Sequence, residues 1–491
     1  MSFLSRFKPA PAVRARLNIG CLFDIPTGTY RLGKHGESIL NGGLSPVTGI
    51  AGRGNMYKST LAHFFTLRAL DRFPKATANV YDTEESLDIT RLEDLSRPLP
   101  NLSKEIPFEQ EVDEMTGEFL SRTMLTSKSV MFGNKWFDEF RTEMKERKGA
   151  KKSLLKTTPF IDSKGENIQI LDPVIGEIDS FSQMDIESHD RKLESNEVGE
   201  TGLNMEAMDS ARAKSQMVMQ LPGVTAMGGG YIILTAHVGD EHQLDPYSPP
   251  SKKLSFLKGK SKLKRVPENF TLLTNNLWFC FTASVLTNQT TKAPEFPRSA
   301  DDDLKGDTDL MKVTIQNLRG KSGPTGLPTD IIVSQREGVQ VGLTEFWYLK
   351  ENKPKGGVGF GIGGHDRSYY LELVPDVNMQ RTTVRGKIHD HPELQRALEI
   401  TSEICQMENL WHHMDRSLLC DPKDLYTQIK EKGYDWDIIL KHTRGYWMFE
   451  EDITDETPKF LSTLDILKMA KGLYHPWWYD DFVAKQKGKD K

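Results

Sequence analysis

The sequence predicts an α/β fold in which a mostly parallel, twisted sheet is flanked by helices. Three stretches support this prediction, because in each an apolar run typical of a buried strand is followed by a polar turn. The stretches are residues 47–60, 76–88 and 168–180. Polar groups at the carboxyl ends of such strands point into the crevice where an α/β sheet binds its ligand. We therefore expect the three turns to form one site.

Composition indicates a soluble globular protein with a sizeable core. The chain has 491 residues, which suffices for two or three domains, and 37% of them are hydrophobic while 27% are charged. No run of about 18 apolar residues occurs, so we expect no membrane-spanning segment and no membrane partner. Residues 1–20 lack an apolar stretch long enough for a secretory signal.

Cysteine usage and net charge exclude some kinds of site and partner. The four cysteines are scattered without C-x-x-C spacing, which argues against a disulfide framework and against a zinc site. This usage fits the reducing cytoplasm, which is the expected location. The net charge of −5 gives no global sign of nucleic-acid binding, so any affinity for DNA must come from local clusters of charge.

The first turn has the features of a phosphate-binding loop. The apolar run reaches Gly52, a polar loop follows, and Lys58 opens an apolar-periodic segment that predicts a helix. Backbone N–H groups of such a loop and the positive end of the helix dipole create an anion site. Lys58 would reach the terminal phosphates of ATP, and the Ser59 hydroxyl would ligate Mg²⁺. The candidate nucleotide-binding residues here are Gly52, Arg53, Gly54, Asn55, Met56, Tyr57, Lys58, Ser59 and Thr60.

One position departs from the usual pattern G-x-x-x-x-G-K-[ST]. Tyr57 stands where the pattern has its second glycine, so the loop fails a strict match. Taken alone, the stretch also fits an ordinary strand, turn and helix with a chance Lys-Ser-Thr. The acidic turns of the other two stretches favour the nucleotide site.

Carboxylates follow the second and third predicted strands. After Tyr81 the chain continues Asp-Thr-Glu-Glu-Ser-Leu-Asp, and Glu84 in this run would orient and deprotonate a water that attacks the terminal phosphate. Asp88 fits an acidic helix cap as well. In the third stretch, Asp179 would hold the Mg²⁺ shell through water, and Ser180 would sense the phosphate.

A local cluster of positive charge lies at residues 252–265. Seven of these fourteen residues are basic and none is acidic. Lysines at flexible spacing suit phosphate contacts, and an aromatic residue among them can stack on an unpaired base. A merely solubilising loop is the alternative. The candidate DNA-binding residues are Lys252, Lys253, Phe256, Lys258, Lys260, Lys262, Lys264 and Arg265.

Further candidates lie at the ends of later strands. Residues 228–237 predict a buried strand that closes at the same crevice with His237, which is either a satisfied strand-end histidine or a relay of nucleotide state. A strand is also predicted at 310–318, and Arg319 and Lys321 follow it. They are either ordinary surface cations or, in an oligomeric ATPase, groups that reach a neighbour's phosphates.

The first third of the chain also contains an arm and an insertion. Residues 1–16 are basic and fit both a frayed tail and an arm that docks on a neighbouring subunit. Residues 95–170 predict an insertion at one edge of the core, with helices at 109–123 and 135–148. Its basic patch at 145–156 is interpreted as a solvated face.

The later part of the chain predicts loops, strands and a helical end. A polar loop at 183–201 leads into a helix whose methionine stripe we attribute to core packing, and another strand is predicted at 271–284. The Gly-rich stretch 356–364 belongs to a hairpin or linker at 351–389. Residues 390–491 predict a small, mainly α C-terminal domain, whose paired histidines lack metal-ligand spacing.

These parts follow one another in a known order. The phosphate loop precedes a strand ending in Asp-Thr-Glu-Glu-Ser-Leu-Asp, then Ile-Asp-Ser, then Thr-Ala-His with a basic loop, then an Arg-x-Lys hairpin. This order resembles the RecA family of DNA strand-exchange proteins, and most closely the phage recombinases of the UvsX type. That type shares the aromatic residue before the phosphate-loop lysine, which Tyr57 matches. The resemblance covers residues 17–350 and implies a RecA-like P-loop ATPase core.

The resemblance implies a catalytic role for three residues. Lys58, Glu84 and Asp179 would act on bound ATP, with Glu84 activating the attacking water. Ser59 would ligate Mg²⁺ directly, and Asp179 would do so through water. Ser180 would lie beside them.

Other positions would recognise the nucleotide or couple it to DNA. His237 would be the polar switch that links ATP to DNA binding. Arg319 and Lys321 would reach the nucleotide across a filament interface. The usual adenine-stacking tyrosine is absent, and Arg91 stands near its place.

Two mobile loops would bind DNA, at residues 183–201 and 238–268. Arg212 and Lys214 lie on the helix after the first loop, where members of the family also touch DNA.

The resemblance implies a DNA-dependent ATPase that forms a helical filament on single-stranded DNA and catalyses homologous pairing and strand exchange with double-stranded DNA in recombination and repair. Its expected partners include a single-strand-binding protein and a loader, and its location would be the host cytoplasm if a bacteriophage encodes it. A hexameric helicase of the DnaB type and a non-catalytic RecA-like recombination mediator are the alternatives. The sequence leaves open whether the assembly is a filament or a closed ring.

Overall fold

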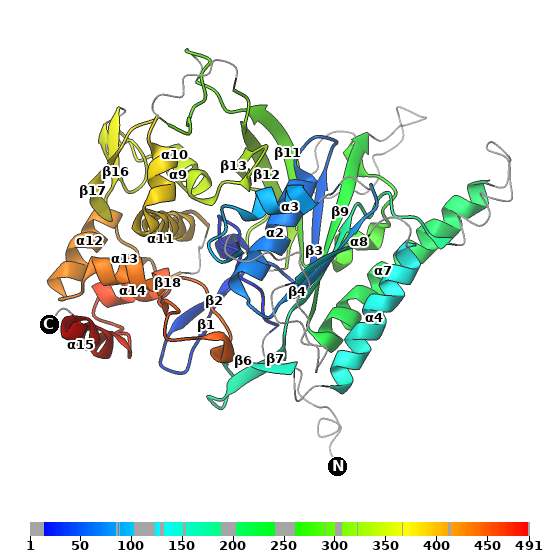
Figure 1. The fold of residues 1–491 in the computed structure, drawn as a ribbon, viewed down its shortest axis with the longest axis horizontal. Helices are drawn as coiled ribbons and strands as arrows, with labels where there is room; N and C mark the ends of the chain where they lie inside the picture. The colour runs from blue at the N-terminus through cyan, green and yellow to red at the C-terminus, as the bar shows by residue number, and fades with distance from the viewer. Residues whose placement is uncertain are drawn as a thin grey trace.

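The computed structural model describes residues 14–489 except for 85–86, 88, 103–122, 128–131, 151–153, 188–202, 241–260, 289, 300–306, 322, 366 and 411–413. These residues form a mixed α/β fold around one large, curled sheet (Figure 1). No helix within the described ranges is both long enough and apolar enough to cross a membrane.

The large sheet is built from ten described strands. They are β3 (Val47–Gly52), β4 (Thr77–Asp82), β5 (Thr123–Ser127), β8 (Val174–Asp179), β9 (Gly230–Asp240), β10 (Ser261–Leu263), β11 (Asn276–Val285), β12 (Leu310–Gly320), β13 (Pro328–Ser334) and β14 (Gly338–Val339). The central strands β11, β3, β9, β8, β4 and β5 are parallel in that order. Strands β12, β13 and β14 continue the sheet antiparallel beyond β11, and β10 pairs with the end of β9.

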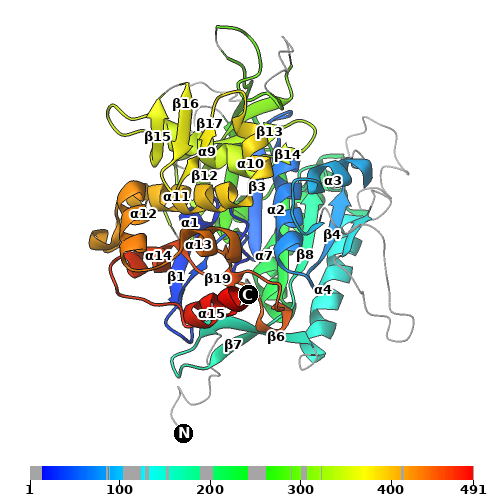
Figure 2. The ribbon, with the colours of Figure 1, turned by 60° about the vertical axis from the view of Figure 1, so that its left-hand side comes forward.

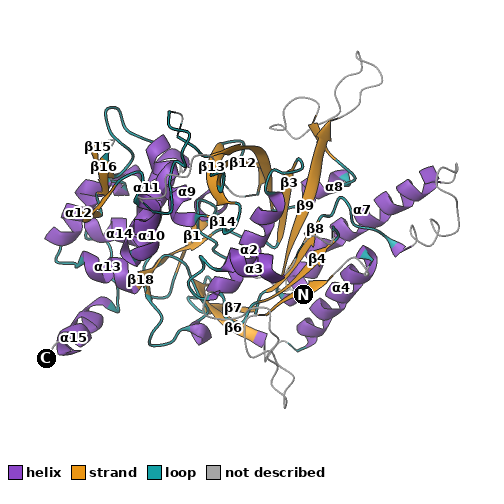
Figure 3. Ribbon diagram, turned by 45° about the horizontal axis from the view of Figure 1, so that its top comes forward, coloured by secondary structure: helices purple, strands orange, loops and turns teal. Residues whose placement is uncertain are grey.

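Helices cover both faces of this sheet (Figures 1 and 3). One face packs on α2 (Lys58–Arg72) and α3 (Ile89–Ser96), and the other on α4 (Gly133–Gly149), α7 (Leu203–Gly228) and α8 (Glu268–Leu273). Successive strand residues alternate between the two cores, as a pleated strand requires. In β3, Ile50 belongs to the core under α2, and Ala51 to the core under α4 and α7. The predicted α/β class with a mostly parallel sheet is confirmed.

A third core lies in the C-terminal part of the chain. Figures 1 and 2 show α12, α13 and α14 on the side of the molecule away from α4. Phe346 of α9, Tyr369 of β16 and Leu398 of α11 share this core with the later helices. The domain boundaries at 351 and 390 stay a prediction. The elements of this part are α9 (Val341–Glu351), β15 (Ile362–His365), β16 (Ser368–Leu371), β17 (Val374–Met379), α10 (Val384–Asp390), α11 (Pro392–Leu410), α12 (Pro422–Glu431), α13 (Trp436–His442), β18 (Thr443–Arg444), β19 (Lys459–Phe460), α14 (Thr463–Ala470) and α15 (Tyr479–Lys489).

Three predicted elements differ from the structure. The strand predicted within 168–180 is two strands, because Pro173 has no N–H group with which to continue a ladder. The first of them, β7 (Asn167–Leu171), leaves the large sheet and pairs with β6 (Leu155–Ile161). Residues 271–273 of the strand predicted at 271–284 belong to helix α8.

The third difference concerns the methionine stripe of α7. Met217 is buried, but Met208 and Met219 are 72% and 65% exposed, so core packing explains only part of the stripe. The helix predicted at 135–148 is confirmed as α4. The helix predicted at 109–123 lies outside the described residues, apart from Thr123 at the start of β5.

Buried charges join the phosphate-loop helix to the C-terminal core. Arg72, at the end of α2, lies 3.5 Å from Asp24 in α1 (Asp24–Thr27) and 3.9 Å from Glu399 in α11. Arg396 donates to Glu399 at 2.6 Å. Burial, and then the charge of Glu399, raise the pKa of Glu403 to about 8. A carboxyl group in this position is neutral over most of the physiological pH range.

We predict that Glu403 makes the protein less stable as pH rises. Its pKa is higher in the folded chain than its ordinary value of 4.5, so the folded state binds this proton more tightly. Stability that is present below pH 4.5 is therefore lost progressively up to about pH 8. Thermal unfolding of wild type and Glu403→Gln between pH 5 and 9 should give melting curves that diverge, with the variant increasingly the more stable. Parallel pH profiles would contradict this prediction.

Candidate functional site

The phosphate loop connects β3 to α2 at the carboxyl edge of the sheet. Strand β3 is buried along its whole length and ends at Gly52, and α2 begins at Lys58. Two loop residues, Asn55 and Tyr57, have left-handed backbone conformations with φ of 59° and 60°. Glycine adopts this conformation without the steric cost that a Cβ brings, which explains why the usual pattern has glycine where Tyr57 stands. The Tyr57 side chain packs against the core under α2.

The beginning of α2 offers free N–H groups to an anion. The first intrahelical bond of the loop runs from the Leu61 N–H to the Tyr57 carbonyl, so the preceding N–H groups have no acceptor within the helix. No acidic residue lies in the first turn. Lys58 is 7% exposed, and its Nζ lies 4.0 Å from Oε1 of Glu84. This is a geometry that suits phosphate.

Glu84 is held in place by a carboxylate from its own turn. Asp82, the last residue of β4, is buried and accepts from the N–H of Glu84 at 2.9 Å and from the N–H of Leu87 at 2.8 Å. These two bonds fix the turn that follows the strand. The Glu84 carboxylate thereby lies between Lys58 and His237, whose Nε2 is 3.2 Å away.

Asp179 ends the neighbouring strand at the same level. The parallel register pairs Asp82 of β4 with Asp179 of β8. Asp179 is buried, and its Oδ1 accepts from the hydroxyl of Thr235 in β9 at 2.6 Å. Thr83 accepts from the Ser180 N–H at 2.7 Å, which joins the two turns. The Ser180 hydroxyl is fully buried and has no hydrogen-bond partner among the described residues.

His237 completes the edge and links it to the basic segment. The register of β3 and β9 pairs it with Gly52. Its Nε2 lies 3.3 Å from Nε2 of Gln183, and its carbonyl accepts from the Lys264 N–H at 2.8 Å. At the end of β9, Asp240 forms a 2.5 Å ion pair with Arg53 of the phosphate loop. The end of β9 is thus bonded to two other segments of this edge, through Gln183 and through Arg53.

The described side chains do not form an all-protein metal cage. No group of three or more His, Cys, Asp or Glu residues within the described ranges is arranged to hold a metal ion. Mg²⁺ is commonly held by one or two protein groups together with substrate phosphates and water. The donors predicted for it, Ser59 and Asp179, fit that mode, and their role stays a prediction.

Arg319 and Lys321 lie at the opposite edge of the sheet from the phosphate loop. The Lys321 N–H donates to Asn275, which precedes β11, and Arg319 is paired with Leu277 near the start of that strand. The Nε of Arg319 is buried without a partner among the described residues. Burial, and then the charges of Arg319 and Arg14, lower the pKa of Lys321. These cations are not placed to serve the phosphate loop of their own chain.

The remaining candidates fall into three groups. Lys252, Lys253, Phe256, Lys258 and Lys260 lie outside the described residues. Lys262, Lys264, Arg265 and Arg212 are exposed. Arg91 and Lys214 bond to carbonyls of their own chain: the partly exposed Arg91 guanidinium donates to Gln335 and Arg336, and the buried Lys214 ammonium donates to Phe181 and Ser182. The roles predicted for Lys214 in DNA binding and for Arg91 in nucleotide binding stay predictions.

Several residues of this edge were not predicted from the sequence. Asp82, Thr83 and Thr235 orient the predicted residues, yet each looks like an ordinary residue of a strand or turn. His63 of α2 lies 2.7 Å from the fully buried Glu177 of β8, which ties the phosphate-loop helix to the strand that ends in Asp179. Burial alone would lower the pKa of His63, but the neighbouring Glu177 outweighs it and the pKa is raised.

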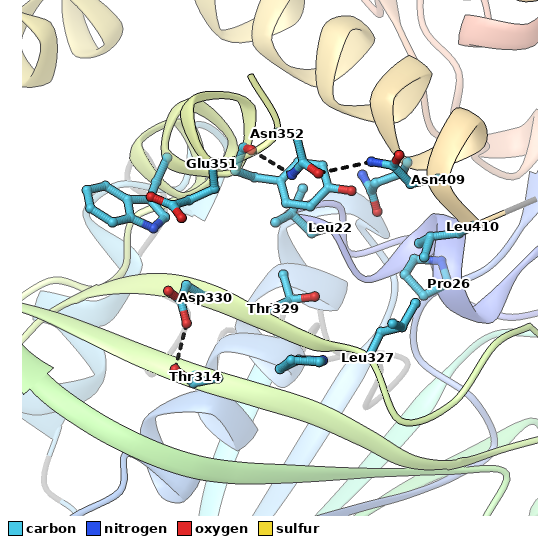
Figure 4. A pocket seen from close by; sticks show the side chains of 14 residues that line it. Leu22, Pro26, Thr314, Leu327, Thr329, Asp330, Glu351, Asn352, Asn409 and Leu410 are labelled. Carbon is cyan, nitrogen blue, oxygen red and sulfur yellow. Dashed lines mark hydrogen bonds between the residues drawn. The ribbon is translucent and has the colours of Figure 1, made fainter. Parts of the chain in front are cut away.

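A separate cavity of about 450 Å³ lies between β12 and β13 on one side and α9 and α11 on the other (Figure 4). Two pairs of its polar side chains bond to each other, Asp330 with Thr314 and Asn352 with Asn409. None of the predicted site residues lines it.

Comparisons with known proteins give little beyond this geometry. No family model matches the sequence, and no curated protein matches it. Among solved structures, the crystal structure of the RadB recombinase is similar, with a TM-score of 0.31 and 13% sequence identity over 61% of this chain and 92% of that chain. A likeness at this level supports no conclusion about function, so the case for a function rests on the site itself.

Proposed function

We propose that this protein is an ATP-dependent recombinase with a RecA-like core, which assembles on single-stranded DNA and catalyses homologous pairing and strand exchange. The main support is the convergence of Lys58, Glu84, Asp179 and His237, from four separate elements, on one edge of a parallel sheet. An α/β sheet binds its ligand at this edge.

The chemistry that suits this edge is ATP hydrolysis. The free N–H groups of α2 and the Lys58 ammonium would hold the phosphates. Glu84, fixed by Asp82, would orient a water and accept its proton as the water attacks the terminal phosphate. Mg²⁺ bound by Ser59 and, through water, by Asp179 would neutralise the charge on the phosphates.

The DNA-binding part of the proposal rests on exposed cations beside the site. Lys262 lies in β10, and Lys264 and Arg265 follow it, with the Lys264 N–H donating to the His237 carbonyl. Arg212 is exposed on α7. Such cations contact phosphate without reading sequence. A change at His237 would reach them through one main-chain hydrogen bond.

We propose self-association because the groups at the two ends of the parallel strands are complementary in charge once a nucleotide is bound. One edge has the phosphate site, and the other has Arg319, Lys321 and Arg14. A head-to-tail contact would place the cations of one subunit against the nucleotide of the next, where they would offset transition-state charge. Such heterologous contacts give a filament when the rotation does not close, and a ring when it does.

We expect Glu84→Gln to abolish most ATP turnover while nucleotide binding persists. The amide keeps the shape of the side chain but cannot accept a proton, so the rate should fall by about 100-fold or more. Turnover is measured with and without single-stranded DNA, and binding with a fluorescent ATP analogue. Glu93→Gln on the exposed face of α3 is the matched control and should retain wild-type turnover.

If the wild-type protein shows no ATP turnover with or without single-stranded DNA, the proposal that it is an ATPase is contradicted. The non-catalytic mediator is then favoured. Full turnover by Glu84→Gln would remove Glu84 from the catalytic role.

A second experiment separates the recombinase from the DnaB-type helicase. We expect ATP-dependent exchange of a strand between a single-stranded DNA and a homologous duplex, and no unwinding of a forked duplex that lacks a homologous partner. Because both enzymes would use the same nucleotide edge, Glu84→Gln should abolish whichever activity is present. Unwinding without strand exchange would contradict the proposed function.

A further inference from the structure

Lys214 is buried although its neighbour Arg212 is exposed. The side chain of Lys214 is 4% exposed. Its ammonium donates to the carbonyl oxygens of Phe181 at 3.1 Å and Ser182 at 3.2 Å, and lies 5.7 Å from the centre of the Phe181 ring. Lysine is almost never this buried unless its charge is compensated. The two carbonyls and the ring provide that compensation.

The cost of this burial is visible in the proton affinity of the group. Burial lowers the pKa of Lys214 to about 8, against the opposing charge of Asp185. An apolar side chain would pack at such a position without desolvating a charge. A buried lysine here therefore points to a role in positioning the two carbonyls that it contacts.

Those carbonyls belong to the segment that directly follows the Asp179–Ser180 turn. The Ser182 hydroxyl accepts from the His237 N–H at 2.9 Å and donates to the Lys264 carbonyl at 2.9 Å. The Phe181 N–H donates to the carbonyl of Thr235, whose hydroxyl holds Asp179. The segment thus contacts Thr235, which holds Asp179, and His237, which lies beside Glu84. It also contacts Lys264, which follows β10.

Lys214 belongs to α7, which follows the first predicted DNA-binding segment in the sequence and packs against α8, at the end of the second. Helix α7 begins at Leu203, directly after residues 188–202 in the sequence. Figure 3 shows α7 and α8 beside β9, and Asn269 of α8 donates to the carbonyl and hydroxyl of Ser215 at 3.0 and 2.9 Å. Lys214 therefore lies where α7 contacts the segment that follows β8, at the carboxyl edge of the sheet.

We propose that Lys214 is a positioning residue that couples DNA binding to ATP hydrolysis, by joining α7 to the Phe181–Ser182 segment. This inference rests on the proposed function. When DNA binds to the chain, the contact with Lys214 sets the position of Asp179 through Phe181 and of His237 through Ser182. A coupling of this kind controls how strongly DNA stimulates ATP turnover. It does not change the affinity for DNA or for ATP measured separately.

The test uses full-length Lys214→Met, Lys214→Arg and the exposed control Arg212→Met. ATP turnover is measured against single-stranded DNA concentration, with DNA binding followed by fluorescence anisotropy and nucleotide binding by a fluorescent ATP analogue. For Lys214→Met we expect basal turnover and both affinities to be retained, while stimulation by saturating DNA falls by about 5-fold or more. Lys214→Arg keeps a cationic donor and should restore part of the stimulation.

The control should show the opposite pattern. Arg212→Met is expected to raise the DNA concentration needed for half-maximal stimulation, with wild-type stimulation at saturation. Wild-type stimulation in Lys214→Met, or an equal loss of basal and stimulated turnover, would overturn the coupling role. Absence of turnover in the wild type would instead refute the proposed function, so the two failures are distinguishable.

Ser182→Ala provides a second route if Lys214→Met fails to fold. This variant leaves the ammonium with both carbonyl partners but removes the hydroxyl bonds to His237 and Lys264. It should lose stimulation in the same way while retaining DNA affinity. Because both residues act in one pathway, the double variant should lose no more than the stronger single variant. Additive losses would contradict a shared path.

Discussion

The parallel register of four strands determines where the candidate site lies in this protein. Gly52 is paired with His237, and Asp82 with Asp179, so the turns after β3, β9, β4 and β8 all emerge at one edge of the sheet. A shift by one residue in any strand would turn its side chains to the other face. The buried residues of each strand, divided between two cores, prevent such a shift. The site is therefore a consequence of how the sheet packs.

Short hydrogen bonds then convert this common edge into a defined arrangement. The Asp82 carboxylate shapes the turn that presents Glu84, and the Thr235 hydroxyl fixes Asp179. Buried carboxylates need such partners, because an unpaired one is costly in a medium of low polarity. The Thr235 hydroxyl also links β9 to β8, and Thr83 links the turn after β4 to the turn after β8. This linkage is the physical basis of the coupling that we propose between nucleotide and DNA.

Much of this site could be predicted from the sequence, because polar residues that directly follow apolar runs can be recognised there. Lys58, Glu84, Asp179 and His237 were found in this way, and the structure brings their strand ends to one edge. Their catalytic and switching roles stay predictions.

What the sequence could not indicate depends on contacts between distant segments. Arg212 and Lys214 look alike in the sequence, yet one is exposed and the other is buried against Phe181, which lies 33 residues earlier. No nearby residue in the sequence marks Asp82 as part of the site, because its carboxylate bonds to the main chain of its own turn. Likewise, the sharing of one core by α9 and α11 follows from tertiary packing, which no local pattern records.

The most direct test of this account is an experimental structure of the protein with Mg²⁺ and a non-hydrolysable ATP analogue. The account predicts that the terminal phosphate contacts the Lys58 ammonium and the N–H groups at the start of α2. It also predicts that the Glu84 carboxylate faces that phosphate and that the metal lies between Ser59 and Asp179. An analogue bound elsewhere, such as in the cavity between β13 and α11, with the edge of the sheet unchanged, would contradict it.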